Sequence, residues 1–163
     1  MNATVKDRLH IVYLSLGSNI HPQENLPRAV ALIRKSVHLQ ALSGVWESPP
    51  VKGPGPKFLN AAALIHTQYS IEDLRTQVLR PIESQLGRIR TADPNAPRTI
   101  DLDILIFDDQ LIEPDLWTLA HLCIPTAQIA SDFAHPESGE LISSVADRLA
   151  RTISIRPHPL ILT

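Results

Sequence analysis

Cysteine is almost absent from this sequence, which has a single thiol, Cys123, in 163 residues. One cysteine excludes an internal disulfide, and a reducing compartment is the simplest setting for such a chain. No apolar run approaches the roughly 20 residues of a membrane span. The apolar stretch 10–16 is short, follows Asp7 and Arg8, and lacks a clear small-residue cleavage pattern, so we interpret it as a strand rather than a signal peptide. We therefore expect a cytoplasmic protein with no membrane partner.

An excess of basic charge is also missing, because the formal net charge is -2. This balance gives no reason to expect binding to nucleic acid. The seven histidines show no metal-ligand spacing, Cys123 has no Cys-x-x-Cys partner, and no Gly-x-x-x-x-Gly-Lys phosphate loop is present. Internal repeats and a domain boundary are absent as well. With 44% hydrophobic residues, the chain is expected to fold as one domain over 1–163.

The most informative stretch is 98–107, in which Asp101 and Asp103 stand two apart within an apolar, β-branched run. This composition predicts a buried strand, where side chains two apart share a face. The residues expected to enter the core on the other face are Leu102, Ile104 and Ile106. Neighbouring buried carboxylates repel each other, and a divalent cation such as Mg²⁺ removes that cost. The alternative is a buried ion network with Arg88, Arg90 or Arg98.

The stretches before this strand alternate between strand-like and helix-like patterns. The expected elements are a strand over 10–16, a helix over 26–37, a strand over 37–47, a proline-rich connector over 48–56, a strand over 58–67, a helix over 71–86, a loop over 91–97 and the Asp-x-Asp strand. This β-α-β-β-α-β order predicts an α+β, ferredoxin-like sandwich, with an antiparallel sheet and both helices on one face.

Capping residues predict where the two helices begin and end. Asn25 is the expected N-cap of the first helix, with Pro27 in its first turn. Ser70 is the expected N-cap of the second helix, and Gly87 is expected to end it. Because Pro81 lies inside this second helix, we expect a kink or a bulge there.

The two ends of the chain give weaker patterns. Residues 1–9 are polar and are interpreted as a loose start. Residues 117–129 are apolar without a clear period, 141–149 suggest a short helix, and 152–163 suggest an edge strand or a tail. Beyond the sandwich we therefore expect only a short C-terminal extension.

Three arginines, Arg88, Arg90 and Arg98, bracket the loop beside the two carboxylates. Guanidinium groups next to a bound Mg²⁺ suit a polyphosphate, because the metal bridges phosphate oxygens and the arginines bind the others. A surface salt-bridge cluster is the alternative, and an Arg-x-Arg pair alone would favour it.

Phe58 and Asn60 are expected on one strand face. An aromatic ring and an amide together suit a flat heterocycle, which needs a stacking surface and a paired donor and acceptor. The alternative is an ordinary core phenylalanine and an asparagine at a strand end.

Together these stretches resemble the 6-hydroxymethyl-7,8-dihydropterin pyrophosphokinase family of the folate pathway. The matching stretches are Leu16-Gly17-Ser18-Asn19, Glu47-Ser48-Pro49-Pro50, Phe58-Leu59-Asn60-Ala61-Ala62, Glu83-x-x-x-Gly87-Arg88-x-Arg90 and Pro97-Arg98-Thr99-Ile100-Asp101-Leu102-Asp103-Ile104. Their order and spacing also match, over roughly residues 11–108. The last stretch, with the upstream Gly-Arg-x-Arg, is the most specific.

The resemblance implies that diphosphate passes from ATP to the pterin hydroxymethyl group, leaving AMP, with pterin and ATP as small-molecule partners. It implies two Mg²⁺ ions on Asp101 and Asp103. The implied nucleotide and phosphate residues are Glu83, Arg88, Arg90 and Arg98, of which Arg88 and Arg98 act in catalysis with the two aspartates. The implied pterin pocket holds Ser48, Pro49, Pro50, Phe58, which stacks, and Asn60, which binds the ring edge. The loop 91–97 matches a mobile loop that closes over ATP.

The chain departs from the family pattern at two places. Asn95 stands where the mobile loop usually carries an aromatic residue. A family segment, Pro-His-x-x-x-x-x-Arg followed by a second pterin-stacking aromatic, is missing because the C-terminal part is shortened. His121 aligns either with the family histidine or with that aromatic. Trp117 and Phe133 are candidates to replace the second stacking surface.

Three other functions stay open on the sequence alone. The shortened segment is compatible with a relative that binds a pterin or a nucleotide without catalysis. A nucleotidyltransferase superfamily also combines Gly-Ser with Asp-x-Asp, but at a short spacing, whereas Ser18 and Asp101 lie far apart here. A ferredoxin-like module that binds nucleic acid would need a basic face, which this composition does not favour.

Overall fold

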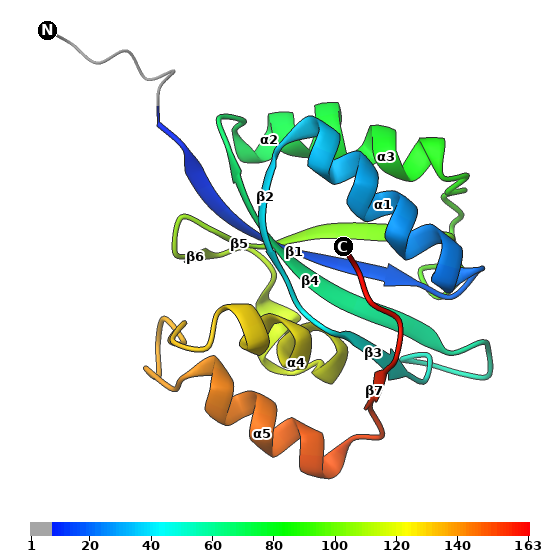
Figure 1. Ribbon diagram of the computed structural model, residues 1–163. Helices are drawn as coiled ribbons and strands as arrows, with labels where there is room; N and C mark the ends of the chain where they lie inside the picture. The colour runs from blue at the N-terminus through cyan, green and yellow to red at the C-terminus, as the bar shows by residue number, and fades with distance from the viewer. Residues whose placement is uncertain (1–7) are drawn as a thin grey trace, which may run out of the picture.

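The computed structural model describes residues 8–163 and shows an antiparallel sheet between two layers of helices (Figure 1). The strands are β1 (His10–Ser18), β2 (His38–Leu42), β3 (Val45–Ser48), β4 (Phe58–Thr67), β5 (Asp101–Phe107), β6 (Gln110–Leu111) and β7 (Arg156–His158). The helices are α1 (Pro22–Ser36), α2 (Ile71–Leu74), α3 (Arg80–Gln85), α4 (Ala120–Ile129) and α5 (Ile142–Thr152). The predicted α+β, ferredoxin-like sandwich is confirmed. The expected loose start lies outside the described residues over 1–7.

The sheet has the order β6-β5-β1-β4-β3-β7, and β2 pairs with β4 beside β3. All of these pairs are antiparallel, and β1 lies between β4 and β5. The strand predicted over 37–47 is two strands, separated at Ser43, whose Oγ accepts a hydrogen bond from the backbone N of Ala62 (2.8 Å). The edge strand suggested near the C-terminus is β7, which pairs with β3.

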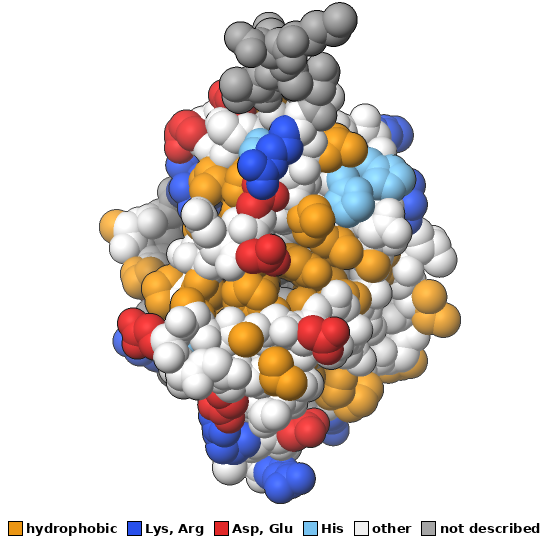
Figure 2. All heavy atoms as spheres, turned by 90° about the vertical axis from the view of Figure 1, so that its left-hand side faces the viewer, with side chains coloured by type: hydrophobic (Ala, Val, Ile, Leu, Met, Phe, Trp, Pro, Cys, Tyr) orange, Lys and Arg blue, Asp and Glu red, His pale blue; other side chains and the backbone are white. Residues whose placement is uncertain are grey.

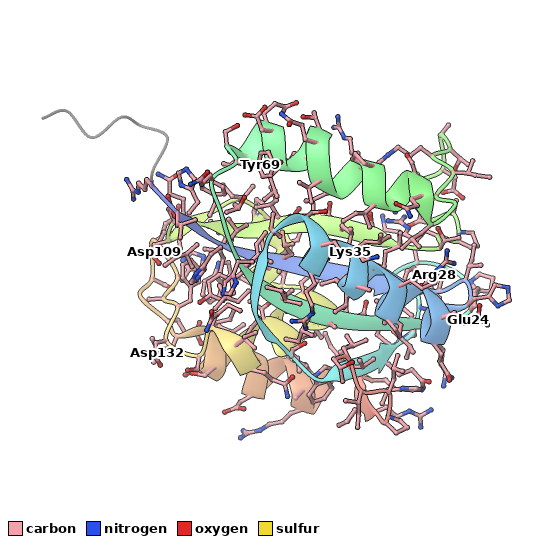
Figure 3. All side chains as sticks on the ribbon, turned by 45° about the horizontal axis from the view of Figure 1, so that its top comes forward. Glu24, Arg28, Lys35, Tyr69, Asp109 and Asp132 are labelled. Carbon is pink, nitrogen blue, oxygen red and sulfur yellow. The ribbon has the colours of Figure 1, made fainter. Side chains whose placement is uncertain are left out.

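The helix α1 covers one face of the sheet together with α2 and α3 (Figure 1). Its buried stripe consists of Leu26, Ala29, Val30 and Ile33. Figure 3 shows Glu24, Arg28 and Lys35 on the outer side of this helix. The predicted start at Asn25 was wrong, because α1 begins at Pro22, directly after His21 in a left-handed conformation (φ 44°). Asn25 instead lies buried within the first turn.

The second predicted helix contains an irregular turn, as Pro81 indicates. Between α2 and α3, Arg75–Leu79 form a π-helical turn, which widens the backbone just before a proline that has no N–H to donate. The N-cap is confirmed, because Ser70 Oγ accepts a hydrogen bond from Asp73 N (3.1 Å). Gly87 follows the helix with φ 80°, a conformation that favours glycine.

The helices α4 and α5 cover the opposite face of the sheet and build a second core (Figure 1). Its largest buried members include Leu105, Ile106, Leu116, Cys123, Ile142 and Val145. Because α4 lies between the sheet and α5, it is apolar on most sides, which explains the missing period in its sequence. Burial raises the pKa of the Cys123 thiol to about 12, so this thiol is protonated and unreactive at neutral pH.

A β-bulge in β5 changes which core its last residues enter. Tyr13 of β1 is opposite Ile106, but the next residue, Leu14, is opposite Ile104, so Leu105 is an extra residue on β5. Leu102 and Ile104 enter the first core, as expected. The expectation for Ile106 was wrong, because the bulge turns it into the second core.

Figure 2 shows the end of the molecule at which β1 begins, where acidic, basic, histidine and apolar side chains are interspersed. Over residues 8–163, no helix combines the length and the apolar character needed to cross a bilayer.

Candidate active site

Three adjacent strands place polar groups in one row across the sheet. Gly17 of β1 is opposite Asn60 of β4 on one side and opposite Asp101 of β5 on the other. Ser15, two residues earlier on β1, is opposite Asp103. Because side chains two apart in a strand share a face, these groups lie together on the face that turns away from α1 and α3. The spacing of the two aspartates therefore predicted their common face correctly.

This row forms the floor of a cavity of about 550 Å³. The cavity is lined by Ser15, Leu16, Gly17, Ser48, Pro49, Pro50, Val51, Lys52, Phe58, Asn60, Pro94, Asn95, Arg98, Asp101, Asp103, Glu113, Asp115, Leu119, His121 and Leu122. All five residues expected to bind the pterin are among them. A second cavity, of about 320 Å³, is lined by Arg88, Arg90, Arg98 and most of the loop 91–97. The two cavities meet at Pro94, Arg98, Asp101 and Asp103.

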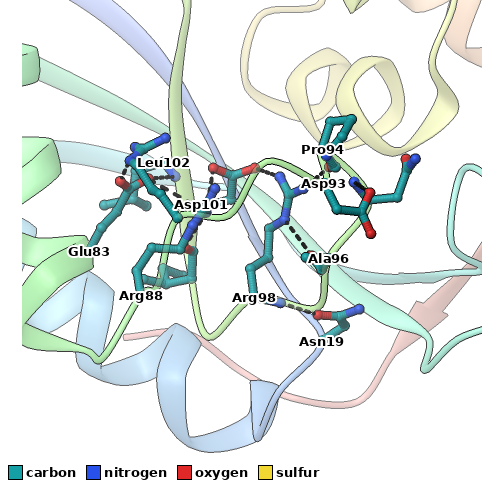
Figure 4. Close-up of polar contacts among 12 residues, drawn as sticks. Asn19, Glu83, Arg88, Asp93, Pro94, Ala96, Arg98, Asp101 and Leu102 are labelled. Carbon is teal, nitrogen blue, oxygen red and sulfur yellow. Dashed lines mark hydrogen bonds and ion pairs between the residues drawn. The ribbon is translucent and has the colours of Figure 1, made fainter.

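Two guanidinium groups hold Asp101 from opposite sides (Figure 4). Arg88 Nη1 donates to Asp101 Oδ1 at 2.7 Å and also to the carbonyl of Ile100 at 2.7 Å. Arg98 Nη1 donates to Asp101 Oδ2. The alternative of an ion network is thus partly realised, and it involves only one of the two aspartates.

Asp103 differs from its neighbour, because no donor within residues 8–163 bonds to its carboxylate. Its side chain is open to the cavity. Loss of water around the carboxylate, and the negative charges of Asp101, Glu83 and Glu113, raise its pKa to about 6, against a smaller opposing effect of Arg88. A cation placed here would relieve this repulsion.

Glu83 is buried and holds other parts of the site in place (Figure 4). One carboxylate oxygen accepts a hydrogen bond from Leu102 N of β5 (2.9 Å), and the other pairs with Arg90 Nη2 (2.6 Å). Arg88 Nη1 lies 3.9 Å from the first oxygen. Glu83 lines neither cavity, and its expected place on the nucleotide side stays a prediction. Its observed contacts orient two arginines and the start of β5.

Asn60 is oriented by the strands on either side of it. Its Nδ2 donates to Ser48 Oγ (2.9 Å) and to the carbonyl of Trp46 (3.2 Å), which leaves Oδ1 directed toward Gly17. Phe58 lies two residues earlier on the same strand and lines the same cavity. The amide and the aromatic ring are thus placed together, as their spacing predicted.

His121, at the start of α4, lines the large cavity opposite the sheet. Burial lowers its pKa below the usual 6.5, against an opposing effect of Asp101, so the imidazole is mostly neutral at pH 7. Trp117 and Phe133 do not line this cavity, because they stack on each other in the second core with ring centroids 5.8 Å apart. As replacements for a stacking surface, both candidates were wrong.

Several other cavity residues were not among the predicted ones, namely Ser15, Lys52, Glu113, Asp115, Leu119 and Leu122. Ser15 could have been found, since it precedes Gly17 by two residues in the predicted first strand and so shares its face. The other residues come from the proline-rich connector and from the region leading into the first turn of α4, where the sequence has no clear period.

The carboxylates of Asp101 and Asp103 suit a Mg²⁺ ion that also binds water and phosphate better than they suit a metal held by protein side chains alone. Asp101 and Asp103 supply hard carboxylate oxygens at the junction of the two cavities. Within residues 8–163, no group of three or more His, Cys, Asp or Glu side chains could enclose a metal ion. Mg²⁺ commonly binds through one or two carboxylates and completes its shell with water and phosphate oxygens. The residues present therefore fit Mg²⁺ that arrives with a polyphosphate.

Comparison with solved structures gives the same fold. Two crystal structures of Plasmodium falciparum HPPK-DHPS triple mutants, one with SDX-DHP and one with pteroate, superpose with TM-scores of 0.70 and 0.71. They cover 93% and 90% of this chain, which spans 46% and 45% of theirs. Sequence identity is 12% in both, so this likeness concerns the fold alone.

Sequence relatives carry the identification further. A Haemophilus influenzae protein named 2-amino-4-hydroxy-6-hydroxymethyldihydropteridine pyrophosphokinase is 34% identical, over 90% of this chain and 98% of its own length. The Schizosaccharomyces pombe folic acid synthesis protein fol1 is 31% identical over 85% of this chain, which spans only 20% of that longer protein. The family described as 7,8-dihydro-6-hydroxymethylpterin-pyrophosphokinase matches residues 13–131. The chain therefore belongs to this pyrophosphokinase family of folate biosynthesis.

Proposed function

We propose that the chain transfers diphosphate from ATP to the hydroxymethyl group of 6-hydroxymethyl-7,8-dihydropterin and releases AMP. The hydroxyl oxygen forms a bond to the β-phosphorus of ATP, and the bond from that phosphorus to the oxygen shared with the α-phosphorus breaks. AMP leaves with the shared oxygen, and the hydroxyl proton is lost to solvent. Family membership supports this reaction, and the two joined cavities supply one place for each substrate.

The large cavity is the proposed pterin site. Phe58 offers a ring face for stacking, and Asn60 offers a free amide oxygen fixed by the hydrogen bond to Ser48. Pro49 and Pro50 form a stiff wall. His121, neutral and on the opposite side, is the proposed second surface against the pterin ring.

The second cavity is the proposed nucleotide site, with the phosphates directed toward the two aspartates. Arg88 and Arg98 lie at the junction, where each can donate to phosphate oxygens as well as to Asp101. Arg90, held by Glu83, lies farther along this cavity. The loop 91–97 forms one wall and is the proposed cover that excludes water from the phosphates.

Asp101 and Asp103 are the residues proposed to hold Mg²⁺, with two ions expected. When bound, Mg²⁺ neutralises phosphate charge and orients the attacking hydroxyl. The observation that carries the whole proposal is the row from Asn60 through Gly17 to Asp101, because it supports a heterocycle site directly beside a phosphate site. Glu83 is proposed to act through Arg90 and Arg88 rather than on the nucleotide itself.

The direct test mixes the protein with Mg-ATP and 6-hydroxymethyl-7,8-dihydropterin and separates the nucleotides by chromatography. The expected products are AMP and the pterin diphosphate in equal amounts. Release of ADP would show single-phosphate transfer and would overturn the proposed bond cleavage. Pterin binding in a calorimeter without any nucleotide turnover would instead show a binding protein.

Replacing Gly17 with alanine is expected to impair pterin binding while leaving the fold intact. The added Cβ would lie 3.5 Å from Asn60 Oδ1 and 4.0 Å from Phe58 Cδ1, so it clashes with neither but fills the floor of the pocket. We expect the KM for the pterin to rise about 10- to 100-fold. Steady-state kinetics with each substrate varied in turn measures this, and the KM for ATP should change much less.

The matched control is Gly44→Ala, whose Cβ would lie 3.4 Å from Gln128 Oε1 and which lines neither cavity. It should leave both KM values unchanged. A pterin KM for Gly17→Ala equal to that of the wild type would contradict the proposed position of the ring.

A further inference from the structure

Three buried polar side chains lie where β1 passes into α1: Ser18 at the end of β1, Asn19 in the turn, and Asn25 in the first turn of α1. Two of them hold the turn itself, because Ser18 Oγ donates to the carbonyl of Ile20 (3.2 Å) and Asn25 Nδ2 donates to the same oxygen (2.7 Å). Asn19 alone reaches outside the turn. Its side chain therefore has a different task from those of its two neighbours.

Asn19 and Arg98 bind each other through reciprocal hydrogen bonds, although they lie 79 residues apart (Figure 4). The side-chain Oδ1 of Asn19 accepts a hydrogen bond from Arg98 N at 2.8 Å. In return, the backbone N–H groups of Asn19 and Ile20 donate to the carbonyl of Arg98 at 3.1 and 3.3 Å. Both polar groups of the Arg98 backbone are thus fixed by the β1–α1 turn.

Arg98 marks the point where the mostly exposed loop 91–97 ends. Its guanidinium donates to Asp101 Oδ2 and to the carbonyls of Pro94 and Ala96 within that loop. A fixed backbone at Arg98 therefore sets both the direction of the guanidinium and the place where the loop is anchored. The buried side chain of Asn19 thus fixes the backbone at this one position, Arg98.

We propose that Asn19 is a positioning residue for the transfer reaction, acting through Arg98. It holds the Arg98 backbone so that the guanidinium lies between Asp101 and the phosphates. This inference rests on the proposed function. Small displacements of a charged group at a reacting phosphate cost rate more than binding, because the geometry matters most in the transition state.

The test compares three variants that separate this role from a merely structural one. Asn19→Leu removes the acceptor at similar size, and Asn19→Asp keeps an acceptor oxygen for Arg98 N. Asn25→Leu removes a buried side-chain amide that donates to the carbonyl of Ile20 and not to Arg98. Asn19→Leu should lower kcat about 10- to 100-fold with smaller changes in both KM values. Asn19→Asp should recover most of that loss. Asn25→Leu should lower the thermal stability about as much as Asn19→Leu does, but it should leave kcat unchanged.

A second readout does not need turnover. Amide hydrogen exchange at Arg98 should be slow in the wild type, in Asn19→Asp and in Asn25→Leu, and faster in Asn19→Leu. If Asn19→Leu does not fold, Asn19→Ser replaces it, since its shorter hydroxyl cannot span the same distance. Equal kcat losses in Asn19→Leu and Asn25→Leu, or no recovery in Asn19→Asp, would overturn the proposal. Absence of AMP release by the wild type would instead refute the proposed function. Hydrogen exchange would then still show whether Asn19 holds the Arg98 backbone.

Discussion

Replacing Asp103 with asparagine is expected to abolish turnover and, at the same time, to stabilise the fold. The carboxylate faces the junction of the two cavities and has no hydrogen-bond donor among residues 8–163, so in the proposed reaction its charge is available to a cation. Its removal should lower kcat at least about a thousandfold, since metal-assisted charge neutralisation contributes several kcal/mol to such reactions. Formation of AMP from Mg-ATP and the pterin measures this loss.

The gain in stability follows from the sign of the pKa shift. The folded state raises the pKa of Asp103 from 3.8 to about 6, so above pH 6 the folded protein holds a charge that the unfolded chain tolerates better. In the absence of metal, the free energy of unfolding of the wild type should therefore fall as the pH rises from 4 to 7. The free energy of unfolding of Asp103→Asn should lack this contribution. At pH 7 the variant should be more stable by about 1–2 kcal/mol, after allowance for solvent screening of this open side chain.

Thermal unfolding of both proteins without metal and nucleotide, at several pH values, measures this difference. Asp109→Asn is the matched control, because Asp109 lies just after β5 and lines neither site cavity. It should leave AMP formation unchanged. An Asp103→Asn protein that is both active and no more stable than the wild type would contradict the role given to this carboxylate.

Replacing Arg98 with lysine is expected to be almost as damaging as replacing it with alanine. The guanidinium donates to Asp101, to the carbonyl of Pro94 and, in the proposed reaction, to the phosphates, and a lysine ammonium cannot satisfy these directions together. We expect kcat to fall about 100- to 1000-fold in both variants, as when one donor to developing charge is removed. Single-turnover AMP formation, with enzyme in excess, measures the transfer step itself.

An exposed arginine of α5 provides the control for Arg98. Arg151→Lys should leave the rate unchanged, because this side chain lies outside both cavities. A fully active Arg98→Lys variant would show that charge alone is enough at this position. The forked geometry would then have no part in the reaction.

The sandwich itself was predictable because its elements have clear periods and strong end signals. The Asp-x-Asp strand, the strand that carries Phe58 and Asn60, the cap at Ser70 and the irregular turn before Pro81 all follow from local chemistry. The common face of Asp101 and Asp103 follows from the two-residue repeat of a strand. These features depend on neighbouring residues only.

The features that the sequence did not reveal depend on long-range packing. The helix α4 has no polar face, since it lies between the sheet and α5, and so its pattern carried no helical period. The bulge at Leu105 follows from the pairing of β5 with β1, and the residues around Leu105 in the sequence do not indicate it. Likewise, Glu83 is held inside the molecule by Leu102 and Arg90, and its spacing to them in sequence gives no hint of these bonds.

We propose that Asp101 and Asp103 bind Mg²⁺ beneath the phosphates of ATP. Mn²⁺ shares the preference of Mg²⁺ for oxygen ligands and can be followed by electron paramagnetic resonance. We expect the wild type, mixed with α,β-methylene-ATP, to bind Mn²⁺ beyond the amount held by the nucleotide alone, and Asp103→Asn to lose this additional binding. Equal Mn²⁺ binding by the two proteins would contradict the claim.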